Sequence, residues 1–117
     1  MSPQFIVSDI DRSIGFYTDK LGFEVDFRYE DFYAAIIKDH HSIHLKLGVP
    51  SIEERKIKRK NSDIDIMFSV EDVEELHEEL SKKQVEIIQP LRNMPYGMEF
   101  YIVDPDGYII AFVESVK

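Results

Sequence analysis

Three histidines at positions 40, 41 and 44 are the residues of this chain best suited to metal or acid–base chemistry, since imidazole is a common metal ligand and titrates near neutral pH. His44 lies in Ile43-His44-Leu45, within an alternation of polar and apolar residues that predicts a β-strand. Residues three apart on a strand point to opposite faces, so His41 and His44 should not converge, and His40 lies in a turn. We therefore expect one inward histidine, His44.

Other catalytic signals are weak or absent. The chain has no cysteine, which excludes disulfides, thiolate metal sites and cysteine nucleophiles and fits a reducing cytoplasm. It contains no G-x-S-x-G motif, no glycine-rich phosphate loop and no dinucleotide fingerprint. Five bases occur among the six residues 55–60; we interpret them as a solvated connecting segment, with anion binding as the alternative.

The elements that must position His44 follow from hydrophobic periodicity. Helices are predicted at 9–21, where Asp9 is the N-cap, and at 72–82. Strands are predicted at 5–7, 23–28, 32–38, 42–47, 64–68, 85–88, 99–104 and 108–114. The alternation is expected to place His44, Asp65 and Ala111 on the concave side of the sheets and the following residues on the helix-facing side: Ile43, Leu45, Leu47, Ile64, Ile66 and Phe68. The turn 104–107 has proline second and glycine fourth, which is typical of a type I turn and predicts a hairpin.

Composition and charge limit the class of protein. With 117 residues, 44% of them hydrophobic and 32% charged, the chain suits a single globular domain. No apolar run approaches the ~18 residues that cross a bilayer, and no secretory signal is visible, so no membrane association is expected. The net charge of −9 argues against nucleic-acid binding.

The predicted elements occur twice in the same order. Val7-Ser8-Asp9-Ile10 matches residues 70–73, and Ile43-His44-Leu45 falls opposite residues 110–112. A duplicated βαβββ unit explains this pattern. The expected organisation is one domain over residues 1–117, with module one at about 1–50, a connecting segment at about 51–62 and module two at about 63–117. The fold class is α+β, with two modules forming curved mixed sheets around a cavity.

Two motifs carry a resemblance to a known family. Residues 8–17 followed by Leu21-Gly22-Phe23, together with Asp104-Pro105-Asp106-Gly107-Tyr108, resemble the vicinal oxygen chelate superfamily. That superfamily includes glyoxalase, bleomycin-resistance proteins and extradiol dioxygenases, and the resemblance covers essentially the whole chain. It implies the fold but not the reaction, because the fold hosts several chemistries and some proteins that only bind.

The resemblance also implies where a metal would be held. The four ligand positions of the family's enzymes fall on Ser2, His44, Asp65 and Ala111. Alanine cannot coordinate and serine is a poor ligand, so only His44 and Asp65 are able to bind, and two ligands rarely hold a divalent ion tightly. No cofactor is therefore expected, with a divalent metal as the alternative.

The sequence is most similar to the bleomycin-resistance-like branch, which implies a homodimer whose crevices sequester a planar or amphipathic molecule. We expect a metal-independent binding protein; the alternative is a lyase, isomerase or dioxygenase with an atypical metal shell around His44 and Asp65, and a weaker one is a domain that only dimerises. Residues 92–98 are expected to form a flexible lip. The candidate ligand-binding residues are Phe27, Tyr29, Tyr33, His44, Asp65, Met67, Arg92, Tyr96 and Tyr101.

Overall fold

The computed structural model describes residues 2–116, which form two compact units. The first unit ends at Ile52 and the second begins at Glu53. The first contains β1 (Gln4–Val7), α1 (Ile10–Gly15), the π-helical turn η1 (Phe16–Lys20), β2 (Glu24–Tyr29), β3 (Tyr33–Lys38) and β4 (His41–Leu47). Helix α2 (Ile52–Asn61) leads into β5 (Ile66–Ser69), α3 (Val73–Lys82), β6 (Ile87–Met94), β7 (Gly97–Val103) and β8 (Ile109–Ser115).

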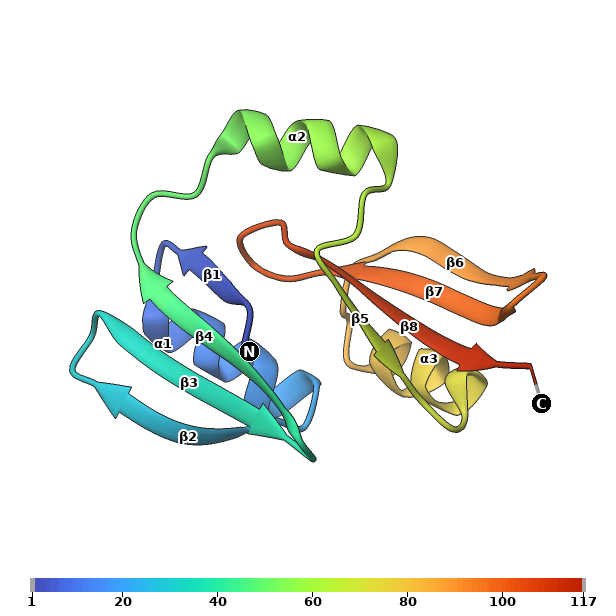
Figure 1. The fold of residues 1–117 in the computed structure, drawn as a ribbon, viewed down its shortest axis with the longest axis horizontal. Helices are drawn as coiled ribbons and strands as arrows, with labels where there is room; N and C mark the ends of the chain where they lie inside the picture. Colours follow the sequence, from blue (N-terminus) through green and yellow to red (C-terminus); the bar gives the residue numbers. More distant parts are fainter. Residues whose placement is uncertain (1, 117) are drawn as a thin grey trace. The chain divides into compact units, whose positions relative to one another are not determined.

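Each unit contains one four-stranded mixed sheet, and the two sheets have the same topology (Figure 1). The strand order is β1-β4-β3-β2 in the first unit and β5-β8-β7-β6 in the second. In both sheets the first strand pairs in parallel with the last, and the remaining pairs are antiparallel. This repeated βαβββ topology confirms the predicted α+β fold of two modules.

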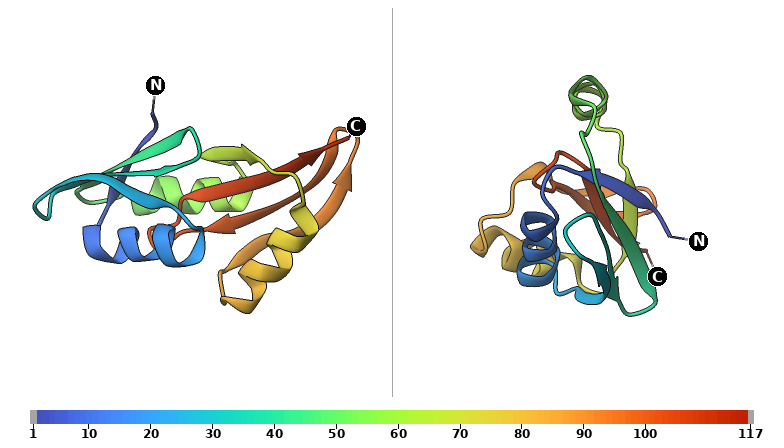
Figure 2. Two further views of the ribbon diagram at one scale, coloured as in Figure 1. Left: turned by 90° about the horizontal axis from the view of Figure 1, so that it is seen from below. Right: turned by 90° about the vertical axis from the view of Figure 1, so that its left-hand side faces the viewer.

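One helix covers one face of each sheet, as the left-hand view of Figure 2 shows for α1 in blue and α3 in yellow. Helix α1 begins at the predicted cap Asp9, and α3 begins in the same way at Asp72. The side chains of these two residues accept hydrogen bonds from the backbone N–H groups of Arg12 and Glu75, at 3.0 Å in each case. Capping satisfies one of the four N–H groups that a helix start leaves unpaired. No helix within residues 2–116 is long and apolar enough to cross a membrane.

The helix-covered face of each sheet is apolar, and the candidate functional side chains lie on the opposite face. In β4, Ile43 and Leu45 are fully buried and His44 is half-buried. In the second unit, Phe68 and Phe100 both pack against Phe112, with ring centroids 5.9 and 5.3 Å away. Strand alternation therefore separates a helix-covered face from an opposite face, here called the open face. In the second unit this opposite face also has a buried apolar part, formed by Tyr101, Val103, Ile109 and Ala111.

Four local expectations are corrected by the structure. Residues 92–98 form no flexible lip, because β6 continues to Met94 and a tight turn leads into β7 at Gly97. Residues 55–60 are part of helix α2. Ile64 lies before β5, is 37% exposed and lines a hollow, and Leu47 is 42% exposed. Neither Ile64 nor Leu47 is therefore a helix-facing core residue.

Candidate functional site

A hollow of about 430 Å³ lies on the open face of the second unit's sheet. Its lining combines apolar and aromatic side chains with a few polar ones: Ile64, Met67, Ser69, Tyr96, Glu99, Tyr101, Val113 and Ser115. Met67 is 56% exposed, whereas Tyr101 and Glu99 are buried. A concave, mostly apolar surface with a few placed polar groups is the usual form of a small-molecule site.

Glu99 is the polar centre of this hollow, with its side chain only 3% exposed. Its Oε2 accepts hydrogen bonds from Arg92 Nη2 at 2.6 Å and Nε at 2.9 Å, across the β6–β7 pair. The Tyr101 hydroxyl donates to the same oxygen at 3.1 Å, and the Tyr96 hydroxyl donates to Oε1. A buried carboxylate is tolerable only when it is paired and hydrogen-bonded in this way.

These contacts move the pKa values of the cluster in opposite directions. Burial by itself would raise the pKa of Glu99, but the hydrogen bonds from Tyr96, Arg92 and Tyr101 hold it below its ordinary value. The hydrogen bond to Glu99 raises the pKa of Tyr96, and burial followed by the same carboxylate raises that of Tyr101. The carboxylate is therefore ionised and both phenols are neutral at neutral pH.

The open face of the first unit carries an aromatic cluster instead. The Phe27 ring stacks on Tyr33 at 6.3 Å, lies at 5.4 Å from Tyr29 and meets His44 edge-on at 5.6 Å. The Tyr33 hydroxyl is 2.6 Å from His44 Nδ1 and accepts a hydrogen bond from Gln4 Nε2 at 3.3 Å. Four of the predicted ligand-binding residues, Phe27, Tyr29, Tyr33 and His44, thus lie together.

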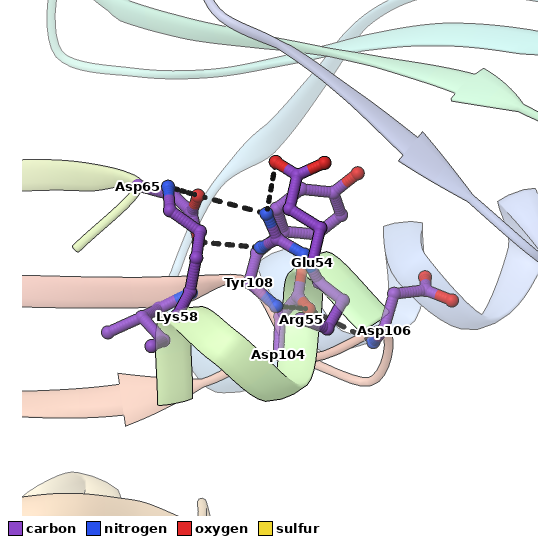
Figure 3. Close-up of polar contacts among 8 residues, drawn as sticks. Glu54, Arg55, Lys58, Asp65, Asp104, Asp106 and Tyr108 are labelled. Carbon is purple, nitrogen blue, oxygen red and sulfur yellow. Dashed lines mark hydrogen bonds and ion pairs between the residues drawn. The ribbon is translucent and has the colours of Figure 1, made fainter. Parts of the chain in front are cut away.

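Asp65 has a structural environment that the sequence did not reveal (Figure 3). Its Oδ2 accepts from Arg55 Nη1 at 2.7 Å and from the Ile109 backbone N–H at 2.8 Å, and its Oδ1 is bonded to Lys58. These contacts outweigh burial and hold the pKa of Asp65 below its usual range. Both oxygens therefore anchor helix α2, and Asp65 is not among the residues that line the hollow.

Arg55 extends this anchor to the β7–β8 turn. Its guanidinium lies 4.2 Å from the Tyr108 ring centroid (Figure 3), a cation–π contact. Within the turn, Asp104 Oδ1 accepts from the backbone N–H groups of Asp106 and Tyr108. Two cations of the basic run, Arg55 and Lys58, thus neutralise a buried carboxylate of their own unit.

The four positions that the resemblance implies for a metal do not form a fitting donor set. Ala111 is fully buried and has no ligand atom. Asp65 is occupied by two cations, His44 Nδ1 faces Tyr33, and the Ser2 hydroxyl is bonded to Ser42. Within residues 2–116, no group of three histidine, aspartate or glutamate side chains could hold an ion. This side-chain chemistry does not suit tight divalent-ion binding.

Sequence reasoning missed Glu99 as a site residue, although a signal was present. Glu99 is a carboxylate inside the strongly apolar strand 97–103. It has the same parity as Tyr101, one of the predicted ligand-binding residues, so the two share a face. A lone carboxylate on the open face of an otherwise apolar strand requires partners when buried, and Arg92, Tyr96 and Tyr101 supply them.

Comparisons with known proteins agree with this fold. Bleomycin resistance proteins of Geobacillus stearothermophilus and Staphylococcus aureus are each 28% identical over 131 aligned positions, which cover 98% of this chain and 96% of theirs. The crystal structure of UcmS2 matches with a TM-score of 0.79 and 24% identity, over 97% of this chain and 96% of that one.

A bleomycin-binding protein from bleomycin-producing Streptomyces verticillus, solved in complex with copper(II)-bleomycin, matches with a TM-score of 0.74 and 23% identity, over 99% and 95% of the two chains. At these identities the structural likeness shows a shared fold. The family model described as Glyoxalase/Bleomycin resistance protein/Dioxygenase superfamily matches residues 3–112. The chain therefore belongs to the Glyoxalase/Bleomycin resistance protein/Dioxygenase superfamily.

Proposed function

We propose that this protein binds and sequesters a small aromatic or amphipathic organic molecule without the help of a metal. The observation that carries the proposal is the hollow of about 430 Å³ in the second unit. Its exposed Met67 and Tyr96 offer apolar and aromatic contact area, and its polar groups converge at Glu99. Such a surface stabilises a bound aromatic molecule through burial and stacking.

The relatives support the same class of function. Two are named as bleomycin resistance proteins, and one structural neighbour is a bleomycin-binding protein. The alternative, a metal-dependent lyase, isomerase or dioxygenase, needs a donor set around His44 and Asp65. Since Asp65 spends both oxygens on Arg55, Lys58 and Ile109, the side chains favour binding over that alternative.

Calorimetric titration with metal-free bleomycin, on protein treated with EDTA, tests this proposal directly. We expect saturable binding, and a stoichiometric ligand should raise the melting temperature by mass action. Met67→Ala should weaken binding by roughly 3–10-fold, because it removes about 1 kcal/mol of buried apolar contact. A parallel thermal-shift screen of aromatic antibiotics and small organic acids extends the test to other ligands.

Ile57→Ala is the matched control, because Ile57 is 58% exposed on α2 and does not line the hollow. It should leave the dissociation constant unchanged. Stabilisation by small anionic metabolites alone would contradict the proposed ligand class. Binding that appears only after zinc, manganese or iron is restored would contradict metal independence.

We also propose that two copies of the chain assemble as a homodimer in the cytoplasm. Several apolar side chains of the first unit are exposed, among them Val25, Tyr29, Phe32 and Leu47, and a second copy would cover such a surface. Light scattering should give twice the chain mass of 13.7 kDa, and cell fractionation should place the protein with cytoplasmic markers. A monomer at micromolar concentration would contradict the dimer.

A further inference from the structure

Both tyrosine hydroxyls at the hollow use their single O–H donor in a hydrogen bond to the same carboxylate. Tyr101 donates to Glu99 Oε2 at 3.1 Å, and Tyr96 donates to Oε1. A phenol has one O–H donor and two acceptor lone pairs. As long as Glu99 is ionised, each hydroxyl retains acceptor capacity only.

The remaining lone pairs differ in availability. The Tyr101 oxygen already accepts a hydrogen bond from Arg92 Nη2 at 3.3 Å, which leaves it one acceptor site. Tyr96 is 48% exposed and lines the hollow. Within residues 2–116, the donor bond to Glu99 is the one hydrogen bond of its hydroxyl, so both lone pairs remain for a ligand.

The nearby cation does not counterbalance this polarity. Arg92 directs Nε and Nη2 to Glu99 and Nη1 to Gln89 Oε1, at 3.2 Å, and it is not among the residues that line the hollow. The hydroxyls of Ser69 and Ser115 also line it, but a serine hydroxyl rotates to donate or to accept and so gives no fixed preference.

We infer that Glu99 sets the hydrogen-bond polarity of the hollow, so that it selects aromatic or apolar molecules with N–H or O–H donors over ligands that only accept. The inference rests on the proposed function and narrows its ligand class. Glu99 acts here as a positioning residue: it fixes the direction of the two phenolic O–H bonds. The ionised state of the carboxylate at neutral pH supports it.

A neutral pair of probes, 2-naphthol and 2-methoxynaphthalene, tests the inference, because the two differ only by an O–H donor replaced with an O–CH₃ group. Calorimetry should give a dissociation constant roughly tenfold lower for 2-naphthol, the effect of one additional hydrogen bond. In Glu99→Gln the amide can donate to a phenol oxygen, which frees an O–H to face the ligand. The preference should then fall to about twofold or less.

Two further variants distinguish the effect of hydrogen-bond polarity in the hollow from the effects of lost negative charge and of lost stability. Tyr96→Phe leaves Glu99 in place but removes an acceptor, so it should also reduce the preference. Glu71→Gln removes one negative charge at an exposed position outside the hollow and should retain the full preference. Melting temperatures and circular dichroism identify any variant that fails to fold.

The outcomes distinguish the inference from the function on which it rests. Equal affinity of both probes, with NMR shift changes mapped to Met67, Tyr96 and Tyr101, would overturn the polarity argument and leave ligand binding intact. An unchanged tenfold preference in folded Glu99→Gln would also overturn it. If neither probe shifts those residues, the hollow is not the binding site, and the proposed function fails as well.

Discussion

The two units share one topology and differ in what their open faces carry. In the first unit, Tyr29 and Tyr33 are partners across the β2–β3 pair. In the second, Arg92 and Glu99 are partners across the β6–β7 pair. An aromatic pair on one scaffold is thus replaced by an ion pair on the other.

The last strands differ in a similar way. His44 in β4 lies beside Ala35 of β3, and Ala111 in β8 lies beside Tyr101 of β7. The bulky polar side chain is on the last strand in one unit and on its neighbour in the other. The helix-covered faces remain apolar in both, with Ile43 and Leu45 buried in one and Ile110 and Phe112 buried in the other. Core packing constrains one face of each sheet, which leaves the other free to differ.

The largest loss of stability is expected when the Asp65 carboxylate is removed, which tests whether Asp65 anchors the second unit. Asp65→Ala leaves Arg55 and Lys58 without their carboxylate and the Ile109 N–H unpaired, so the free energy of unfolding should fall by about 3 kcal/mol. Urea denaturation measures the change. Glu86→Ala breaks the exposed Arg59–Glu86 pair and should cost under about 1 kcal/mol. Equal costs for the two variants would show that Asp65 is not an anchor.

The ion pair of the second unit should produce an acid-dependent loss of stability. The pKa of Glu99 is lowered on folding from the ordinary 4.5, so its contribution is fully present above about pH 4.5 and is lost as the pH falls through the folded-state value. Glu99→Gln should therefore cost about 2 kcal/mol at pH 7 and progressively less below pH 4.5. Urea midpoints across pH 3–7 measure this, and a pH-independent difference would contradict it.

Substitutions on the aromatic face of the first unit should reduce stability less than those of Asp65 and Glu99. Tyr33→Phe keeps the ring stacked on Phe27 but removes the hydroxyl that contacts His44 and Gln4, which should cost about 1 kcal/mol in urea unfolding. Tyr29→Phe, at a side chain that is 59% exposed, should change stability by less than about 0.5 kcal/mol. If Tyr29→Phe lowered the free energy of unfolding more than Tyr33→Phe does, the Tyr33 hydroxyl would not be the main polar contact of this face.

Metal removal should have the smallest effect. Because Ala111 supplies no donor and Asp65 is occupied, EDTA should leave the melting temperature of both units unchanged, and elemental analysis of protein purified without chelator should find less than stoichiometric metal. The melting temperature of EDTA-treated protein is compared with that of protein saturated with nickel. Equimolar bound metal that also raises the melting temperature would contradict the prediction.

The sequence predicted the strands and the helices α1 and α3 because their signals are local, whereas residues 52–61, expected as a connecting segment, form helix α2. Alternating apolar residues, the cap Asp9 and the turn at 104–107 each act within a few positions, and all appear in the structure. The Gly107 N–H donates to the Asp104 carbonyl at 3.0 Å, and Gly107 has a φ of +92°, a conformation that favours glycine. The residues 92–98 were harder to predict, since Pro95 and Gly97 suggest a loop as readily as a hairpin turn.

The sequence by itself determined the duplicated fold and which residues share the open faces, because strand parity and helix periodicity depend on short-range order. Only the tertiary structure decided which of those residues meet. Asp65 and Glu99 are both carboxylates of the second unit, the first directly before β5 and the second within β7. Yet Asp65 is held by Arg55 and Lys58 of α2, and Glu99 by Arg92 and two tyrosines. Sheet register and helix placement decide which side chains become the partners of each carboxylate. Those partners in turn decide whether a buried charge anchors the fold or faces a hollow.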